Sequence, residues 1–155
     1  MILCDSNVWL ALALGGHSLH TIAREWLDKI EKPAVLVFCR ATQQSLVRLL
    51  TNSAVLGAFG NQPLTNLQAW AVYEAFVADD RVVYQADEPP GLEAQWKKLA
   101  LRDTPSPKLW MDAYLAAFAM TSGYRMVTGD LGYRQFEGLE LQILRPTAPA
   151  DHDSI

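Results

Sequence analysis

Three aspartates occupy positions where their side chains could share a cation. Asp5 follows the apolar residues "MILC", Asp112 lies within "LWMDAYLAAFAM", and Asp130 follows "RMVTG". A carboxylate beside buried apolar residues is unfavourable unless an opposite charge or hydrogen bonds compensate it. Carboxylates that are brought together raise one another's pKa unless a cation neutralises them, and clusters of oxygen ligands suit Mg²⁺ or Mn²⁺. The three acids are therefore candidate ligands of a divalent metal ion.

The segments around the acids predict an alternation of strands and helices. Continuous apolar runs without polar alternation predict buried parallel strands at residues 2–5, 34–38, 81–85, 125–130 and 141–145. Helical spacing of apolar residues separates them, at residues 7–16, 17–32, 41–52, 65–79, 92–101 and 109–123. This order is typical of an α/β fold, here a three-layer α/β/α sandwich with a central, mostly parallel five-stranded sheet. We expect one domain over residues 1–146 and a mobile tail over residues 147–155.

The predicted sheet brings the three acids to one edge. In parallel α/β sheets, sites form just past the carboxyl ends of the strands. Asp5 ends the first strand and Asp130 follows the fourth. Asp112 lies in the first turn of the helix before the fourth strand, and that helix runs antiparallel to the strand, so its start points to the same edge. The alternative for each acid is a local role as a helix cap, because aspartates favour helix N-termini.

Gln43 is predicted to point towards the same edge from a neighbouring helix. It lies in the first turn of the helix over residues 41–52, and it shares an apolar face with Val47 and Leu50. Glutamine is neutral where an acid would complete a set of four. A glutamine that is hydrogen-bonded to the backbone is the alternative.

Four segments, in this order, carry a more specific signal: "CDSNVWLAL", "TQQSLVRLLTN", "WMDAYLAAFA" and "MVTGDLGYRQF". They resemble the PIN-domain ribonucleases, and most closely the VapC-type toxins of bacterial toxin–antitoxin pairs. The resemblance extends from Ile2 to about Leu144. Each motif alone is weak, but four in the right order and spacing are a strong signal.

The resemblance assigns roles to individual residues. The catalytic, metal-binding acids of the family match Asp5, Asp112 and Asp130. Asp5 and Asp112 would bind the metal, directly or through water, and Asp130 would complete the site or position the attacking water. Asn7 and Thr128 match polar residues that accompany the first and last acids, as supporting groups or weak ligands. Gln43, a further supporting group or weak ligand, stands where the family usually has Glu.

The resemblance implies a PIN-like nuclease domain over residues 1–146. Its implied activity is metal-dependent endoribonuclease hydrolysis of RNA phosphodiester bonds with Mg²⁺ or Mn²⁺, as the toxin of a VapBC-type pair. The implied partners are an RNA substrate, with tRNA and rRNA as candidates, and a cognate antitoxin, and we also expect a homodimer. The departure at Gln43 leaves a second interpretation open, a catalytically weakened or inactive PIN-fold module that only binds a partner.

Two other phosphate-handling folds place an Asp after the first strand. Phosphatases of the haloacid-dehalogenase type need a second acid two residues later, where this chain has Asn7. Response-regulator receivers need adjacent acids after the first strand and a Lys after the last, and neither is present. We therefore set both aside.

Composition limits the remaining possibilities. The chain has 155 residues and a net charge of −4, which argues against binding nucleic acid by bulk electrostatics but not against a local basic patch. No apolar run is long enough to span a membrane, and no secretion signal is recognisable. We expect Cys4 and Cys39 to be small, buried apolar residues of a protein in a reducing compartment. We expect a cytoplasmic protein that does not bind membranes.

Overall fold

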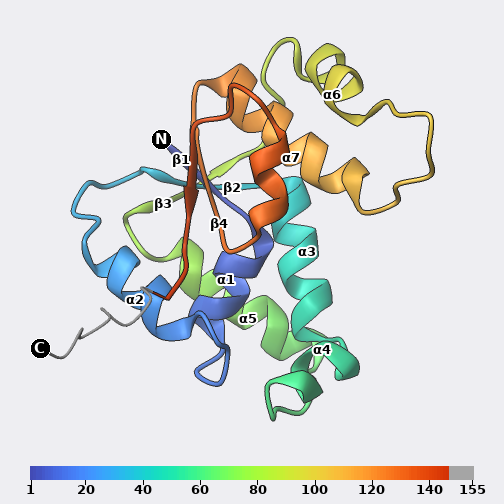
Figure 1. The fold of residues 1–155 in the computed structure, drawn as a ribbon. Coiled ribbons are helices and arrows are strands. Elements are labelled where there is room, and N and C mark those ends of the chain that lie inside the picture. The colour runs from blue at the N-terminus through green and yellow to red at the C-terminus, as the bar shows by residue number, and fades with distance from the viewer. Residues whose placement is uncertain (147–155) are drawn as a thin grey trace, which may run out of the picture.

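A five-stranded sheet in which every neighbouring pair of strands is parallel forms the centre of the computed structural model, which describes residues 1–146 (Figure 1). The strands are β1 (Ile2–Cys4), β2 (Leu36–Cys39), β3 (Val82–Gln85), β4 (Arg125–Thr128) and β5 (Leu141–Ile143). Their order across the sheet is β3-β2-β1-β4-β5. The predicted α/β fold with five strands is confirmed, and the described sheet is wholly rather than mostly parallel.

Helices cover both faces of this sheet. They are α1 (Ser6–Ala13), α2 (His20–Asp28), α3 (Arg40–Leu50), α4 (Ser53–Ala58), α5 (Asn66–Val77), α6 (Leu92–Ala100) and α7 (Leu109–Ser122), with a 3₁₀ turn, η1 (Leu131–Gln135). Helices α1 to α5 pack around one apolar cluster, and α6, α7 and η1 pack around another. The result is the predicted three-layer sandwich.

Alternation along the strands builds the two clusters. In β2, Leu36 and Phe38 belong to the cluster beneath α1, whereas Val37 and Cys39 belong to the cluster beneath α7. Successive side chains of a strand point to opposite faces, so a strand covered on both sides must be apolar at every position. Trp9 of α1 stacks on Phe38 with ring centroids 4.0 Å apart, which fixes α1 against the sheet. This packing holds the start of α1 beside the end of β1.

Local signals explain where the helices begin and end. Thr65 caps α5, since its hydroxyl accepts from the Gln68 backbone N–H at 3.2 Å and the Gln68 side chain accepts from the Thr65 N–H at 2.9 Å. The helix predicted over residues 41–52 stops before Asn52, because the Asn52 side chain caps a separate short helix, α4. Gly123 follows α7 with φ +67°, a conformation that glycine adopts readily, and the chain turns there into β4.

Several predicted elements are shorter in the structure. The helix expected over residues 7–16 ends at Ala13. Of the helix expected over residues 17–32, only the residues of α2 (His20–Asp28) are helical. The strand expected over residues 125–130 ends at Thr128, because Asp130 already caps η1.

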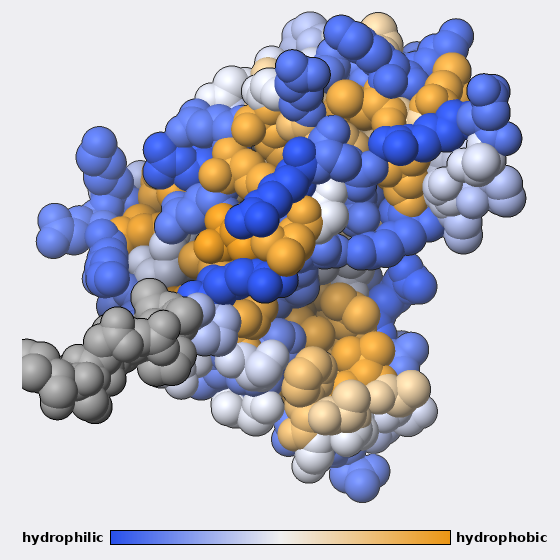
Figure 2. All heavy atoms as spheres, in the orientation of Figure 1, coloured by the Kyte–Doolittle hydropathy of each residue, from blue (hydrophilic) through white to orange (hydrophobic). Residues whose placement is uncertain are grey.

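Polar side chains separate the groups of apolar side chains on the face seen in Figure 2.

Other expectations concern the cysteines, the membrane and the tail. Cys4 and Cys39 are buried free thiols, as predicted. Within residues 1–146, no helix is both long and apolar enough to cross a membrane. The predicted mobile tail, residues 147–155, lies outside the described residues.

Candidate active site

A hollow of about 540 Å³ lies at the carboxyl edge of the sheet, and the three predicted acids line it. β1 and β4 are adjacent and parallel, so the residues that follow them meet at this edge. Helix α7 returns the chain to β4, and its first turn therefore lies at the same edge. The lining residues are Asp5, Ser6, Asn7, Ser45, Arg48, Leu49, Thr51, Asn52, Lys108, Met111, Asp112 and Asp130.

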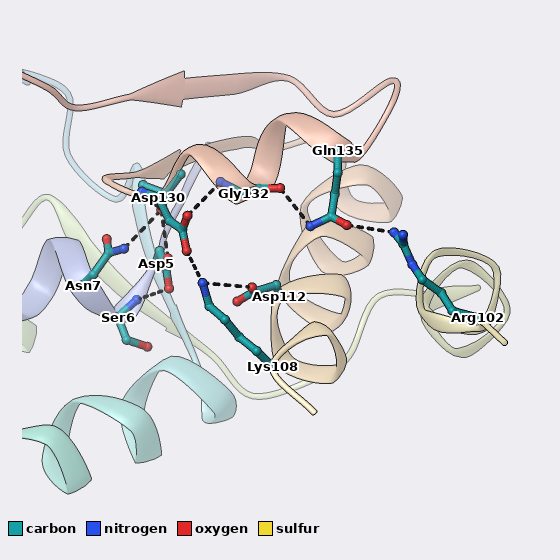
Figure 3. Close-up of polar contacts among 10 residues, drawn as sticks. Asp5, Ser6, Asn7, Arg102, Lys108, Asp112, Asp130, Gly132 and Gln135 are labelled. Carbon is teal, nitrogen blue, oxygen red and sulfur yellow. Dashed lines mark hydrogen bonds and ion pairs between the residues drawn. The ribbon is translucent and has the colours of Figure 1, made fainter. Parts of the chain in front are cut away.

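Asp5 is both a helix cap and a member of this site (Figure 3). Its Oδ1 accepts from the Ser6 backbone N–H at 2.7 Å at the start of α1, and its Oδ2 accepts from the Thr128 hydroxyl at 2.8 Å. Burial raises the pKa of Asp5 to about 6, repulsion from Asp112 and Asp130 adds to the rise, and the two hydrogen bonds oppose it. The capping role and the shared site are therefore compatible, rather than alternatives.

Thr128 and Asn7 tie the end of β1 to the end of β4. The buried Thr128 hydroxyl accepts from the Asp130 backbone N–H at 3.0 Å and from Asn7 Nδ2 at 3.3 Å, in addition to its bond to Asp5. Asn7 Oδ1 accepts from the Gly129 N–H at 3.1 Å. One donor and two acceptor positions of the hydroxyl are thus used, which is its full capacity. This network fixes Asp5 relative to the turn that carries Asp130.

Asp130 caps η1 and faces a lysine. Its Oδ1 accepts from the Gly132 N–H at 2.7 Å, and its Oδ2 accepts from Lys108 Nζ at 2.5 Å. The hydrogen bond from Lys108, followed by the one from Gly132, lowers the pKa of Asp130. Asp130 is therefore the acid whose ionised form Lys108 stabilises most directly.

Asp112 lies in the first turn of α7 with 15% of its side chain exposed. Burial raises its pKa, the charge of Lys108 opposes the rise, and the charge of Asp130 adds to it. The buried Tyr133 hydroxyl lies near Asp112 without a hydrogen-bond partner of normal geometry among the described residues. Asp112 is therefore a partly desolvated acid that Asp130 repels and Lys108 partly compensates.

The structure does not bring Gln43 to the hollow. Its Oε1 accepts from Arg40 Nη1 at 2.5 Å, and the Arg40 guanidinium lies 5.0 Å from the centroid of the Tyr84 ring, in edge strand β3. Gln43 does lie on the buried face of α3 with Leu50, as predicted, but that face packs into the core. Gln43 is thus paired with Arg40 and is not among the lining residues of the hollow, and its expected role as a supporting group or weak ligand stays a prediction. From the same helix, Ser45 and Arg48 line the hollow instead.

Comparison with known proteins places the chain in a family. The model of the PIN domain family matches residues 2–139. The chain belongs to the PIN domain family. It is 60% identical over 144 residues to Ribonuclease VapC41 of Mycobacterium tuberculosis (strain ATCC 25618 / H37Rv), and the match covers 93% of this chain and 99% of VapC41. The family resemblance read from the four motifs is thereby confirmed.

Solved structures of PIN domains share the fold. VapC20 of Mycobacterium tuberculosis, described as a Sarcin-Ricin loop cleaving toxin, aligns with a TM-score of 0.62 at 20% identity, over 92% of this chain and 99% of VapC20. VapBC2 from Rickettsia felis, bound to a promoter DNA fragment, aligns with a TM-score of 0.64 at 14% identity, over 94% of this chain and 100% of the aligned chain. At these identities the comparison establishes the fold of this PIN domain.

The acids of this PIN domain suit a hard divalent cation in their chemistry. Three carboxylates supply only oxygen ligands. Burial raises the pKa of Asp5, and repulsion from Asp112 and Asp130, which a bound cation would offset, adds to the rise. As arranged, no three His, Cys, Asp or Glu side chains within residues 1–146 are close enough to hold one ion together. The Lys108 ammonium instead contacts both Asp130 and Asp112. The donor set suits Mg²⁺ or Mn²⁺ by its chemistry, and the lysine contacts two of the three candidate ligands.

Lys108 and Ser45 are among the lining residues of the hollow that sequence reasoning missed. Lys108 lies four residues before Asp112, a spacing at which side chains of a helix meet, and this spacing could have revealed it. Ser45 is two residues from Gln43, so about 200° of helix rotation separates them, and only the orientation of α3 against the core decides which one faces the acids.

Proposed function

We propose that this PIN domain is a metal-dependent endoribonuclease and the toxin of a VapBC-type toxin–antitoxin pair. The observation that carries the proposal is the gathering of Asp5, Asp112 and Asp130 in one hollow at the carboxyl edge of the sheet. The 60% identity to a protein named a ribonuclease supports the same activity. Asp5 follows β1, Asp112 lies in α7 and Asp130 lies in the turn after β4, and nothing in local structure alone requires the three acids to meet.

The residues of the hollow have separate tasks in this proposal. Asp5, Asp112 and Asp130 would hold Mg²⁺ or Mn²⁺, which when bound lowers the pKa of water and stabilises charge at the phosphodiester. The Ser6 N–H and the Thr128 hydroxyl orient the two oxygens of Asp5. These two hydrogen bonds hold the Asp5 carboxylate in one orientation before a substrate binds, and groups that are oriented in advance stabilise developing charge without the cost of reorienting.

Arg48 is the candidate contact for the RNA backbone. It is exposed, lies on α3 and lines the hollow beside Asn52. The net charge of −4 means that attraction for RNA must come from such local cations and not from the molecule as a whole. VapC20 is described as cleaving the Sarcin-Ricin loop, so structured rRNA and tRNA are the first substrates to test here.

We further propose a cognate antitoxin and a homodimer as partners. Solved structures with the same fold include VapBC2 from Rickettsia felis and VapBC-1 from nontypeable Haemophilus influenzae. Both names combine VapB with VapC. For the homodimer, Trp110 and Met111 at the start of α7 are 50% and 42% exposed, and exposed apolar groups of this kind favour protein interfaces.

The alternative of an inactive binding module rested on Gln43. Because Gln43 bonds to Arg40 and lies outside the lining of the hollow, its neutral side chain removes no ligand from the site. The geometry therefore favours the enzyme.

The test is cleavage of a mixed pool of tRNA and rRNA by the purified protein, with Mg²⁺, Mn²⁺ or EDTA, beside Asp130→Asn. We expect discrete cuts that need the metal and that Asp130→Asn abolishes, and sequencing of the new ends would then give the target. Cleavage that persists in EDTA, or that Asp130→Asn leaves unchanged, would contradict the proposal.

A further inference from the structure

A cation supplied by the chain itself lies among the acids. Lys108 Nζ is 2.5 Å from Asp130 Oδ2 and 3.7 Å from Asp112 Oδ2 (Figure 3). These two acids come from different elements, and the ammonium bridges them. Asp5 also lies close enough to stabilise the charged form of the lysine. The positive charge therefore sits within the set of carboxylates to which the proposed function assigns the metal.

Only the ammonium group of Lys108 contacts the acids. Lys108 is the residue just before α7, and 73% of its side chain is exposed. Its aliphatic stem is not packed in the core, so the side chain can leave the acids by rotation about its own bonds without opening the fold. The charged contact is thus reversible.

The distances show which charges the ammonium compensates. Asp5, Asp112 and Asp130 line one hollow, so three negative charges are brought together there. Lys108 pairs with Asp130 and Asp112 and so offsets part of their mutual repulsion. It does not make an ion pair with Asp5 in the described structure, so the compensation is partial.

We propose that Lys108 is an internal counter-ion, which takes part of the cation position in the metal-free protein and competes with the divalent ion for Asp112 and Asp130. The inference rests on the proposed function, because it assumes that these acids bind Mg²⁺ or Mn²⁺. An ammonium and a divalent ion repel each other and cannot share the same carboxylate oxygens, so metal binding requires that the lysine move away. Lys108 therefore lowers the apparent affinity for metal while it stabilises the acids in its absence.

The experiment compares Mn²⁺ binding by isothermal titration calorimetry in wild type, Lys108→Met and Lys97→Met. All three are first stripped with EDTA and then freed of the chelator. Lys97 is an exposed residue of α6 without an ion pair among the described residues, so its variant matches the change in net charge. Asp112→Asn serves to show that the measured heat comes from this site. Because Lys108 is exposed, Lys108→Met should fold normally, and circular dichroism checks this.

We expect Lys108→Met to bind Mn²⁺ about five- to tenfold more tightly than wild type, and Lys97→Met to bind as wild type does. Equal affinity of Lys108→Met and wild type would overturn the inference and leave the proposed function intact. Weaker binding by Lys108→Met would also overturn it, and would show that the lysine supports the metal-bound form. If neither wild type nor Lys108→Met binds Mn²⁺, the metal dependence in the proposed function fails, and the inference fails with it.

Discussion

The Thr128 hydroxyl donates a hydrogen bond to Asp5 Oδ2 at 2.8 Å and so joins the ends of two adjacent strands that lie 123 residues apart in the chain. The same hydroxyl accepts from the Asp130 N–H at 3.0 Å. One buried side chain thus positions the first and the last acid of the candidate site relative to each other. The sheet brings the acids to one edge, and Thr128 fixes their relative orientation.

Thr128→Val should destabilise the protein. The substitution keeps the shape of the side chain but removes the partner of Asp5 Oδ2, Asn7 Nδ2 and the Asp130 N–H. We therefore expect a loss of about 1–3 kcal/mol in the free energy of unfolding. Thr128→Ser keeps the hydroxyl and should lose less. Urea unfolding of both variants in EDTA measures the difference. Equal stability of the two variants would show that the hydroxyl does not hold the network together.

Asp5 should make the metal-free protein less stable as pH rises. Its pKa is raised from 3.8 to about 6, so between these values the folded state binds a proton that the unfolded state has lost. The free energy of unfolding therefore falls as pH rises through this window, by at most about 3 kcal/mol. In Asp5→Asn this contribution is absent. The stability of Asp5→Asn relative to wild type should thus increase from pH 4 to pH 7.

The check is denaturant unfolding of both proteins in EDTA at several pH values. The difference between them cancels the groups that titrate alike in both proteins, whereas Asp112 and Asp130, which repel Asp5, contribute to the difference through that coupling. A difference that stays constant with pH would show that the pKa of Asp5 is not raised in the folded state.

Glutamates placed at two positions of α3 should have different effects. Ser45 lines the hollow and Gln43 does not, so Ser45→Glu should add a ligand and tighten Mn²⁺ binding by about tenfold. Gln43→Glu should leave the affinity unchanged, because its new charge would pair with Arg40. Calorimetry on this matched pair tests the orientation of α3. A larger effect from Gln43→Glu would contradict the placement of the helix.

Arg48 should contribute to RNA binding through its charge. We expect Arg48→Met to weaken binding of RNA and to reduce the slope of log K against log salt by about 0.7, as for one phosphate contact on a single strand. Binding is measured in the Asp112→Asn background, so that cleavage does not interfere. Arg24→Met, at an exposed residue of α2, is the control. Equal slopes for the two variants would exclude Arg48 from the RNA contact.

Much of the fold follows from the sequence because its strands are fully buried. "AVLVF" and its counterparts are continuous apolar runs, a pattern that a parallel sheet with two covered faces requires. The ends of the elements were less predictable, because they depend on caps. β4 ends two residues earlier than the apolar pattern predicts, because the Asp130 side chain caps the start of η1.

The three acids could be placed from topology alone, whereas the direction of Gln43 could not. The spacing of Lys108 predicts its contact with Asp112 but not the one with Asp130. Asp5 and Asp130 follow adjacent strands, so their meeting is a property of the sheet. The direction of Gln43 depends on how α3 rotates against α5 and the core, and one sequence does not specify that rotation. The position of the Lys108 ammonium depends on a long exposed side chain, which responds to the acids that surround it.

The most direct test of the central claim, that Asp5, Asp112 and Asp130 act through a shared divalent ion, is the RNA cleavage rate as a function of Mn²⁺ concentration. The proteins are wild type, Asp112→Asn and, as a control, Asp103→Asn, which changes an exposed acid outside the hollow. We expect saturable rates for wild type and Asp103→Asn, and for Asp112→Asn a rate at least about a hundredfold lower, since the bound metal supplies several kcal/mol. Cleavage by Asp112→Asn at the wild-type rate, or a wild-type rate that does not depend on Mn²⁺, would contradict the claim.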